Sequence, residues 1–351
     1  MKFSIISFFF FLVAGSLFAG ETLQLMAPEK QAYTGAYVDF GEKEDHVTRE
    51  SIEAFERKVG KHQAIIASSS YWGKNSFPKK NIEIISNYGA VPLIYWSPWD
   101  KPYEQSSKPD RFHLKNILAG QYDAYIDMWA EGAKACHYPI MVAWGIEMNG
   151  TWFPWSGYFY GKGELDTNGH FTGPEVYKKT YRYIVDRVRK KGASNIIWVF
   201  HANNSSDPDE KWNTMKQYYP GDDYVNWLGL SAYGQQYPGQ GWLTFNESFP
   251  DYYKKICAVT PNKPVILAEW GIGYFPKSGN RAAWIAEALW RFTTEFPRLK
   301  AAVFWHERWQ NGDKKYSNLY VDASPACLKS YREGVSNLFW LGNPLFKSEK
   351  P

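Results

Sequence analysis

The chain has 351 residues, of which 44% are hydrophobic and 22% charged, and its formal net charge at pH 7 is +4. The charge is small and spread along the chain, and the basic residues include only short Lys-Lys pairs. This distribution argues against a nucleic-acid-binding protein with a basic surface. Aromatic residues make up 18%, more than a core requires, so some of the rings are expected to line a surface or cleft. The composition is typical of a soluble globular protein.

The N-terminus has the form of a targeting segment. Lys2 precedes an apolar run from Phe8 to Phe18, and the small residues Ala19-Gly20 follow it. The run is too short to span a bilayer and matches the apolar part of a secretory signal. We therefore expect residues 1–20 to be a signal peptide, with an uncleaved membrane anchor as the alternative. Residues 21–351 are expected to form one domain that is secreted or periplasmic.

Eight short apolar runs alternate with stretches of helical spacing along the rest of the chain. They are Gly35–Val38, Ala64–Ala67, Val91–Trp96, Ile140–Gly145, Ile196–Phe200, Trp227–Ser231, Val265–Ala268 and Ala301–Trp305. No glycine-rich phosphate loop follows the first run. The alternation predicts an α/β fold, a (β/α)8 TIM barrel.

Two of the expected helices have recognisable ends. Pro174 opens a helix over Glu175–Lys191, and Asn280 is a plausible N-cap for a helix over Arg281–Phe296. The longest irregular stretch, 149–173, is rich in aromatic residues and follows the fourth expected strand. Because the loops after barrel strands build the active face, this stretch is expected to lie at the functional site.

Cysteine and histidine spacing gives no sign of a metal site. Cys136, Cys257 and Cys327 are far apart without CxxC spacing, and we expect buried thiols rather than a disulfide framework. The seven histidines form no pair at helical spacing. We therefore expect no cofactor and no metal.

Two glutamates stand where apolar strands end, Glu147 and Glu269. Burying a carboxylate is unfavourable unless it has an ion-pair partner or a chemical role, and the fourth and seventh strands carry no Arg or Lys. In a barrel both would project from the C-terminal rim into one cleft. A pair of carboxylates roughly 5 to 5.5 Å apart is the arrangement of retaining glycosidases. The sequence thus predicts glycoside hydrolysis.

The residues around these glutamates resemble a known family. Glu147-Met148-Asn149-Gly150-Thr151-Trp152-Phe153-Pro154-Trp155, the segment 218–229 and Glu269-Trp270-Gly271 are similar to motifs of glycoside hydrolase family 26. The resemblance covers roughly residues 30 to 335 and implies a clan-A barrel that hydrolyses β-linked polysaccharides with retention.

The resemblance also implies roles for individual residues. Glu147 would be the acid/base, Glu269 the nucleophile, and Tyr233 the group that orients the nucleophile. The residues expected to contact the sugar chain are Trp152, Trp155, Trp305, Asn149 and His201. Asn203, His306 and Glu307 are further candidates for polar contacts with substrate.

One residue departs from the family pattern, because Ile146 stands where mannanases of this family usually have His. Isoleucine has no group that could contact the sugar near its 2-hydroxyl. We expect a secreted, retaining endo-β-glycanase with β-1,4-mannan as its first-choice substrate, and mixed-linked β-glucan or β-1,3-xylan as the alternatives. A non-catalytic carbohydrate-binding barrel and an enzyme processing a self-made exopolysaccharide also stay open. The expected partner is polysaccharide, with no nucleic acid and no stable membrane association, and the protein is expected to be a monomer.

Overall fold

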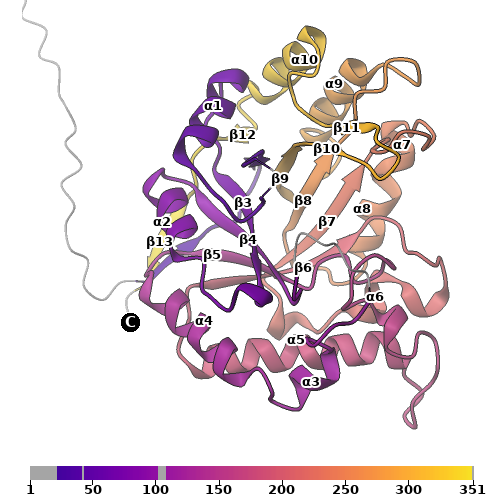
Figure 1. The fold of residues 1–351 in the computed structure, drawn as a ribbon. Helices are drawn as coiled ribbons and strands as arrows, with labels where there is room; N and C mark the ends of the chain where they lie inside the picture. Colours follow the sequence, from indigo (N-terminus) through magenta and orange to yellow (C-terminus); the bar gives the residue numbers. More distant parts are fainter. Residues whose placement is uncertain (1–21, 42, 102–107, 350–351) are drawn as a thin grey trace, which may run out of the picture.

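The structure is a computed structural model that describes residues 22–41, 43–101 and 108–349, so the expected signal peptide lies outside the described residues. Eight parallel strands pair in sequence order, and the last pairs with the first, which closes a barrel (Figure 1). The strands are β2 (Ala32–Val38), β3 (Ile65–Tyr71), β4 (Val91–Ser97), β5 (Ile140–Trp144), β6 (Ile196–Asn203), β7 (Trp227–Tyr233), β8 (Val265–Gly271) and β9 (Leu299–His306). Each corresponds to one of the eight predicted runs, so the (β/α)8 barrel is confirmed.

Helices surround the barrel on its outer side (Figure 1). The longer ones are α1 (Arg49–Val59), α2 (Lys79–Asn87), α4 (Asp123–Ala135), α5 (Thr172–Lys190), α8 (Pro250–Cys257), α9 (Arg281–Phe292) and α10 (Pro325–Val335). Short turns are α3 (Leu114–Leu118), α6 (Met215–Tyr218), α7 (Phe245–Ser248), and the 3-10 helices η1 (Trp72–Lys74), η3 (Gly157–Phe159), η4 (Lys211–Asn213) and η5 (Asp222–Tyr224). None of the helices in the described residues combines the length and hydropathy of a bilayer span.

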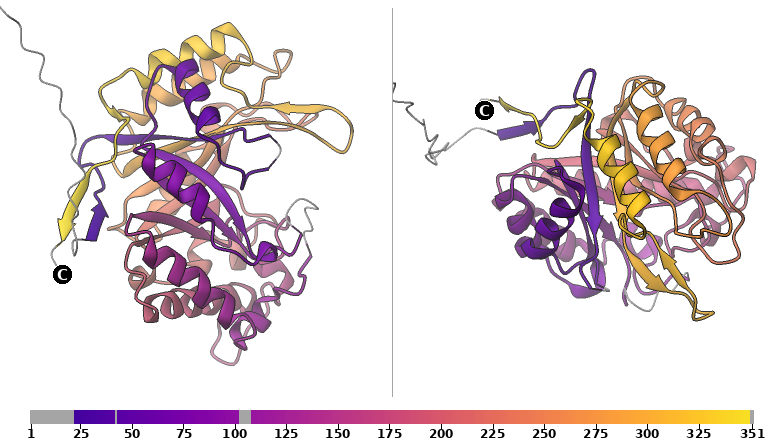
Figure 2. Two further views of the ribbon diagram at one scale, coloured as in Figure 1. Left: turned by 60° about the vertical axis from the view of Figure 1, so that its left-hand side comes forward. Right: turned by 90° about the horizontal axis from the view of Figure 1, so that it is seen from above.

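Additional strands lie outside the barrel. β12 (Trp340–Leu341) pairs with β2 in parallel, and β1 (Thr22–Leu25) pairs with β13 (Phe346–Glu349) in antiparallel fashion. Figure 2 shows β1 and β13 side by side, away from the barrel. The hairpin of β10 (Arg308–Gln310) and β11 (Tyr316–Asn318) projects from the barrel after β9 (Figure 2).

The helix boundaries differ from the prediction at two ends. α5 begins at Thr172, so Pro174 lies inside its first turn and not at its first position. α9 ends at Phe292, four residues before the predicted end. There the Thr293 hydroxyl donates to the Trp290 carbonyl at 2.7 Å, and such side-chain bonds compete with continuation of the helix. The predicted cap is confirmed, because the Asn280 side chain accepts a hydrogen bond from the N–H of Ala283.

Most barrel strands are buried along their whole length, because helices cover one face and interior side chains fill the other. β3 and β6 run further than their apolar runs, to Tyr71 and Asn203. Their last residues are polar but still pair with the neighbouring strands. These extensions carry polar side chains to the C-terminal end of the barrel, where Glu147 and Glu269 were expected.

The cysteines are free thiols, as predicted, but only Cys327 is fully buried. Cys136 and Cys257 are partly exposed. The prediction of three buried thiols is therefore wrong for these two.

Candidate active site

Glu147 lies in the turn after β5, three residues beyond the last strand residue, Trp144. Its φ is 52°, a left-handed conformation that residues other than glycine rarely adopt. The N–H of Glu147 donates to the carbonyl of His201 on β6 at 2.8 Å, which ties the turn to the neighbouring strand. A backbone held in such a conformation fixes the direction of its side chain and is typical of functional sites.

Two neutral donors hold the Glu147 carboxylate. The indole N–H of Trp152 donates to Oε2 at 2.7 Å, and the Asn203 amide donates to Oε1 at 2.9 Å. The side chain is 8% exposed, so it is largely shielded from water but still reachable. Because neither donor is a cation, the explanation of Glu147 as half of a structural ion pair does not apply.

The side chain of Asn149 forms two hydrogen bonds with the backbone of Asn203. Its amide donates to the Asn203 carbonyl at 3.0 Å, and its Oδ1 accepts the Asn203 N–H at 2.9 Å. Asn149 is fully buried, so the expected contact with the sugar is not what the structure shows. It fixes the backbone of the residue that donates to Glu147.

Glu269 lies within β8, opposite Ser231 of β7. The Tyr233 hydroxyl, two residues further along β7, donates to Glu269 Oε2 at 2.9 Å. Glu269 is 8% exposed, the same fraction as Glu147. The predicted placement of Tyr233 beside Glu269 is therefore what the geometry shows.

The two glutamates are coupled electrostatically. Burial raises the pKa of Glu269 well above its usual range, the charge of Glu147 raises this pKa further, and the Tyr233 hydrogen bond opposes both effects. One neutral carboxylic acid beside one carboxylate is the combination that a retaining glycosidase uses.

Trp305 is the last residue but one of β9, one residue before the strand ends at His306, and it stacks on Tyr37 of β2 with ring centroids 4.1 Å apart and an interplanar angle of 18°. The two residues are also paired in register where β2 meets β9. The Trp305 indole N–H donates to Glu307 Oε2 at 2.8 Å. Trp305 is thereby held as a rigid ring at the C-terminal end of the barrel.

The two tryptophans after β5 have different environments. Trp152 is partly exposed and its indole N–H is bonded to Glu147, so part of this ring is accessible next to the carboxylate. Trp155 is 1% exposed, donates to the Ile146 carbonyl at 2.6 Å and stacks on Phe153 at 4.7 Å. The structure thus contradicts a direct sugar contact for Trp155, because the ring is enclosed. Its partner Phe153 is the more exposed of the two.

The histidines expected to contact substrate are buried as well. His201 is fully buried, and its Nε2 lies 2.7 Å from the Ser231 hydroxyl. Burial lowers the pKa of His201 to about 3, so the ring is neutral at physiological pH. His306 accepts the Val321 N–H at 2.9 Å, and its pKa is also lowered to about 3 by burial. Both rings support the barrel end from inside, and neither is placed to bind a sugar.

Sequence reasoning missed Tyr95 and Tyr37. The Tyr95 hydroxyl donates to the carbonyl of Ala268, the residue before Glu269, at 2.7 Å. Its ring lies 6.1 Å from that of Trp305. Both tyrosines occupy positions near the C-terminal ends of predicted strands, which is the signal that could have identified them.

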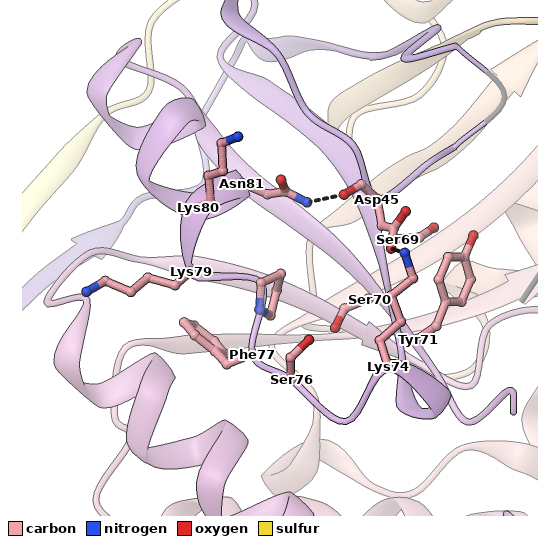
Figure 3. Close-up of a pocket in the computed structure, with 11 residues that line it drawn as sticks. Asp45, Ser69, Ser70, Tyr71, Lys74, Ser76, Phe77, Lys79, Lys80 and Asn81 are labelled. Atoms are coloured by element: carbon pink, nitrogen blue, oxygen red, sulfur yellow. Dashed lines mark hydrogen bonds and ion pairs between the residues drawn. The ribbon is translucent and has the colours of Figure 1, made fainter.

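A cavity of about 190 Å³ lies beside β3 and the start of α2, lined by Asp45, Ser69, Lys74, Asn81 and neighbouring residues (Figure 3). Its lining contains neither Glu147 nor Glu269. Within the described part of the chain, no group of three or more His, Cys, Asp or Glu side chains could hold a metal ion.

Comparisons with known proteins identify the family of this chain. Residues 106–291, just over half of the chain, match the family described as Glycosyl hydrolase family 26. Endoglucanase H of Acetivibrio thermocellus is 30% identical over 290 residues, which are 81% of this chain and 29% of that protein. A mannan endo-1,4-beta-mannosidase of Bacillus subtilis is 24% identical over 259 residues, 72% of this chain and 62% of that protein. The chain therefore spans less than two thirds of the length of either relative.

Solved structures share the fold. The Bacillus subtilis mannanase man26 has a TM-score of 0.57 at 19% identity, covering 80% of this chain and 81% of that one. GH26C of a Muricauda species has a TM-score of 0.63 at 16% identity, covering 89% and 87%. At such identities the likeness supports the barrel alone. The family match over more than half of the sequence carries the assignment: the chain belongs to glycosyl hydrolase family 26.

Proposed function

We propose that this protein is a secreted, retaining endo-β-glycanase in which Glu147 is the acid/base and Glu269 the nucleophile. The observation that carries the proposal is the pair of buried, interacting glutamates, with Glu147 held by Trp152 and Asn203 and Glu269 held by Tyr233. A non-catalytic binding barrel would not need two carboxylates in this arrangement, so the pair favours an enzyme.

The geometry supports a two-step reaction. In the first step the neutral Glu147 gives its proton to the glycosidic oxygen while the Glu269 carboxylate attacks the anomeric carbon. The bond to the leaving sugar breaks, and a glycosyl ester on Glu269 forms. In the second step the Glu147 carboxylate takes a proton from water, whose oxygen attacks the same carbon and releases Glu269. Two inversions give net retention, and both glutamates return to their starting states.

Tyr233 and Asn203 hold the two reacting carboxylates in place. The hydrogen bond from Tyr233 favours the ionised form of Glu269 and limits the rotation of its carboxylate. Asn203 and Trp152 bind opposite oxygens of Glu147 and limit its rotation. Orientation of this kind is a large part of what an enzyme contributes to the rate.

A β-glucan is the substrate that we favour, with β-1,4-mannan as the second candidate. Ile146 has no polar side-chain group for the 2-hydroxyl, whose orientation distinguishes mannose from glucose. The longest of the matches described above is with a protein named as an endoglucanase. Mannan stays in consideration because other relatives are named as mannan endo-1,4-beta-mannosidases. β-1,3-Xylan is third, since the relatives named as β-1,3-xylanases match only 44% of this chain.

Hydrolysis of a polysaccharide panel tests the proposal. Mixed-linked barley glucan, glucomannan, mannan and β-1,3-xylan are incubated with the protein, and the products are sized. We expect oligosaccharides of several lengths early in the reaction, which is the pattern of internal cleavage.

Glu269→Ala should abolish turnover, and azide should restore part of it with an activated aryl glycoside by occupying the vacated space. An unchanged rate in Glu269→Ala would remove the nucleophile assignment.

Export is tested separately. The full chain is expressed in a bacterium, and the N-terminus of the protein found outside the cytoplasm is sequenced. Cleavage near Ala19-Gly20 is expected from the short apolar run before it. Retention of an intact N-terminus in the membrane fraction would favour the anchor instead.

A further inference from the structure

The strand β8 contains a β-bulge directly before Glu269. Two consecutive residues of β7, Leu230 and Ser231, pair with residues 267 and 269 of β8, so Ala268 is an extra residue between them. The ladder between β8 and β9 shifts its register over the same stretch. A bulge of this kind adds one residue to a strand and changes the direction of the side chains that follow it.

The bulge determines the face of the strand on which Glu269 lies. Side chains alternate between the two faces of a strand, and paired residues of neighbouring strands share a face. With the bulge, Glu269 shares the face of Ser231 and of Tyr233, two residues further along β7. In a regular ladder Glu269 would stand opposite Ala232, on the other face. The bulge therefore brings the Glu269 carboxylate to the Tyr233 hydroxyl, 2.9 Å away.

Tyr95 contacts this bulge from across the barrel. It lies on β4, which is opposite β8 in the closed barrel, with three strands between them in either direction. Its hydroxyl donates to the Ala268 carbonyl at 2.7 Å, and both residues are buried. A buried carbonyl needs a hydrogen-bond partner, and the extra residue of a bulge is left without a paired residue. Tyr95 thus binds the residue that sets the face of Glu269.

The Tyr95 ring is itself held inside the barrel. Its centroid lies 5.8 Å from that of the His201 ring and 6.1 Å from that of the Trp305 ring. The His201 carbonyl in turn accepts the N–H of Glu147 at 2.8 Å. Because Tyr95 is only 1% exposed, it has no surface for a substrate. Any effect of Tyr95 on the reaction must therefore pass through the groups that it holds.

We infer that Tyr95 is a positioning residue for the nucleophile: its hydroxyl holds the bulge at Ala268 and thereby keeps Glu269 on the face from which it attacks. This inference rests on the proposed function, in which Glu269 is the attacking group. Misplacement of a reacting group by about 1 Å can lower a rate by about 100-fold. Loss of the Tyr95 hydroxyl should therefore slow the chemical step and leave substrate binding nearly unchanged.

Kinetics of Tyr95→Phe test the inference, because this variant removes only the hydroxyl. With an activated aryl glycoside we expect kcat to fall about 10-fold or more, while KM changes by about 2-fold or less. Tyr33→Phe is the matched control. The buried Tyr33 also donates its hydroxyl to a backbone carbonyl at 2.7 Å, that of Met26, but it lies near the N-terminal end of β2. The control should lower the melting temperature without changing kcat.

Azide separates positioning of the nucleophile from general damage to the site. In Glu269→Ala, azide takes the place of the missing carboxylate, so the Tyr95 hydroxyl has no carboxylate left to position. The azide-supported rates of Glu269→Ala and of Glu269→Ala combined with Tyr95→Phe should agree within about 2-fold. A merely structural role of Tyr95 would instead reduce the azide-supported rate by the same factor as kcat.

A second variant restores a donor at the same ring position. Tyr95→4-aminophenylalanine keeps the ring and carries an amine N–H, which is a weaker donor than a phenol O–H. Its kcat should lie between that of Tyr95→Phe and that of the unmodified protein. If Tyr95→Phe fails to fold, as judged by thermal unfolding, this variant replaces it in both comparisons, with the same expected directions.

The outcomes are distinct. An unchanged kcat in Tyr95→Phe, an equal fall of kcat in Tyr33→Phe, no recovery with 4-aminophenylalanine, or an azide-supported rate that falls as far as kcat would overturn the inference. If azide supports no turnover, the comparison of Tyr95→Phe with Tyr33→Phe decides alone. Full activity of Glu269→Ala would instead refute the proposed function, because the nucleophile would then be another group.

Discussion

The hydroxyl of Tyr233 donates a 2.9 Å hydrogen bond to Glu269 from the neighbouring barrel strand. This bond opposes the two effects that raise the pKa of Glu269, its burial and the charge of Glu147. The nucleophile must be ionised when it attacks, and the Tyr233 hydrogen bond is the contact that favours the ionised form of this buried carboxylate.

Tyr233→Phe should therefore shift the acidic limb of the pH–rate profile to higher pH. Removing a donor to the carboxylate raises the pKa of Glu269, so more of the activity on the acid side is lost. The rate at the optimum should fall about 10-fold or more. Tyr181→Phe is a matched control, because the Tyr181 hydroxyl is buried without a hydrogen-bond partner among the described residues. An identical profile for Tyr233→Phe and the unmodified protein would contradict this role.

Asn203→Ala should weaken the acid/base step. The variant loses the 2.9 Å bond that orients Glu147, while Glu147 itself remains. We expect kcat/KM on polysaccharide to fall about 10- to 100-fold. An activated aryl glycoside should be affected much less, because its leaving group needs little protonation. Asn168→Ala, in the exposed part of the loop, is the control. Equal losses on both substrates would show that Asn203 acts elsewhere.

Trp155→Ala should reduce stability and Trp152→Phe should not. Trp155 is 1% exposed and packed against Phe153, so its truncation leaves a cavity and costs about 3 to 5 kcal/mol. Trp152→Phe keeps an aromatic ring beside the cleft but loses the N–H bonded to Glu147. Thermal unfolding and polymer kinetics of both variants check this division. A Trp155→Ala protein with unchanged melting temperature would mean that the ring is not part of the core.

Buried histidine makes the fold sensitive to acid. Burial lowers the pKa of His201 to about 3, below the value of about 6.5 in an unfolded chain, so the unfolded state binds the extra proton first. The stabilisation is fully present above pH 6.5 and is lost as the pH falls toward 3. Between pH 7 and 4.5 the free energy of unfolding of the unmodified protein should fall by about 2 kcal/mol more than that of His201→Asn, as measured by urea unfolding. His170→Asn, on an exposed loop, should behave like the unmodified protein.

The barrel could be predicted because its strands are buried on both faces and therefore appear as continuous apolar runs. The two glutamates could be predicted because each places a charged side chain shortly after such an apolar run. The strand ends were less predictable. Residues such as Ser69 and Asn203 are polar and still extend the ladder, because the neighbouring strand supplies backbone partners regardless of side chain.

The side-chain environment of each site residue could not be predicted. Trp152 and Trp155 lie in the same motif, yet one is partly exposed and the other enclosed, and nothing in their spacing distinguishes them. Asn149 and His201 are polar residues near the cleft that turn inward and support other groups.

Covalent trapping tests the central claim most directly. A 2-deoxy-2-fluoro aryl glycoside of the preferred sugar slows both steps, and its activated leaving group lets the glycosyl ester accumulate. Mass spectrometry of the intact protein should show one added fluoroglycosyl group, and peptide mapping should place it on Glu269. Glu269→Ala should not be labelled, whereas the Asn168→Ala control should be labelled like the unmodified protein. A label on another residue, or hydrolysis with inversion at the anomeric carbon and no label, would contradict the account.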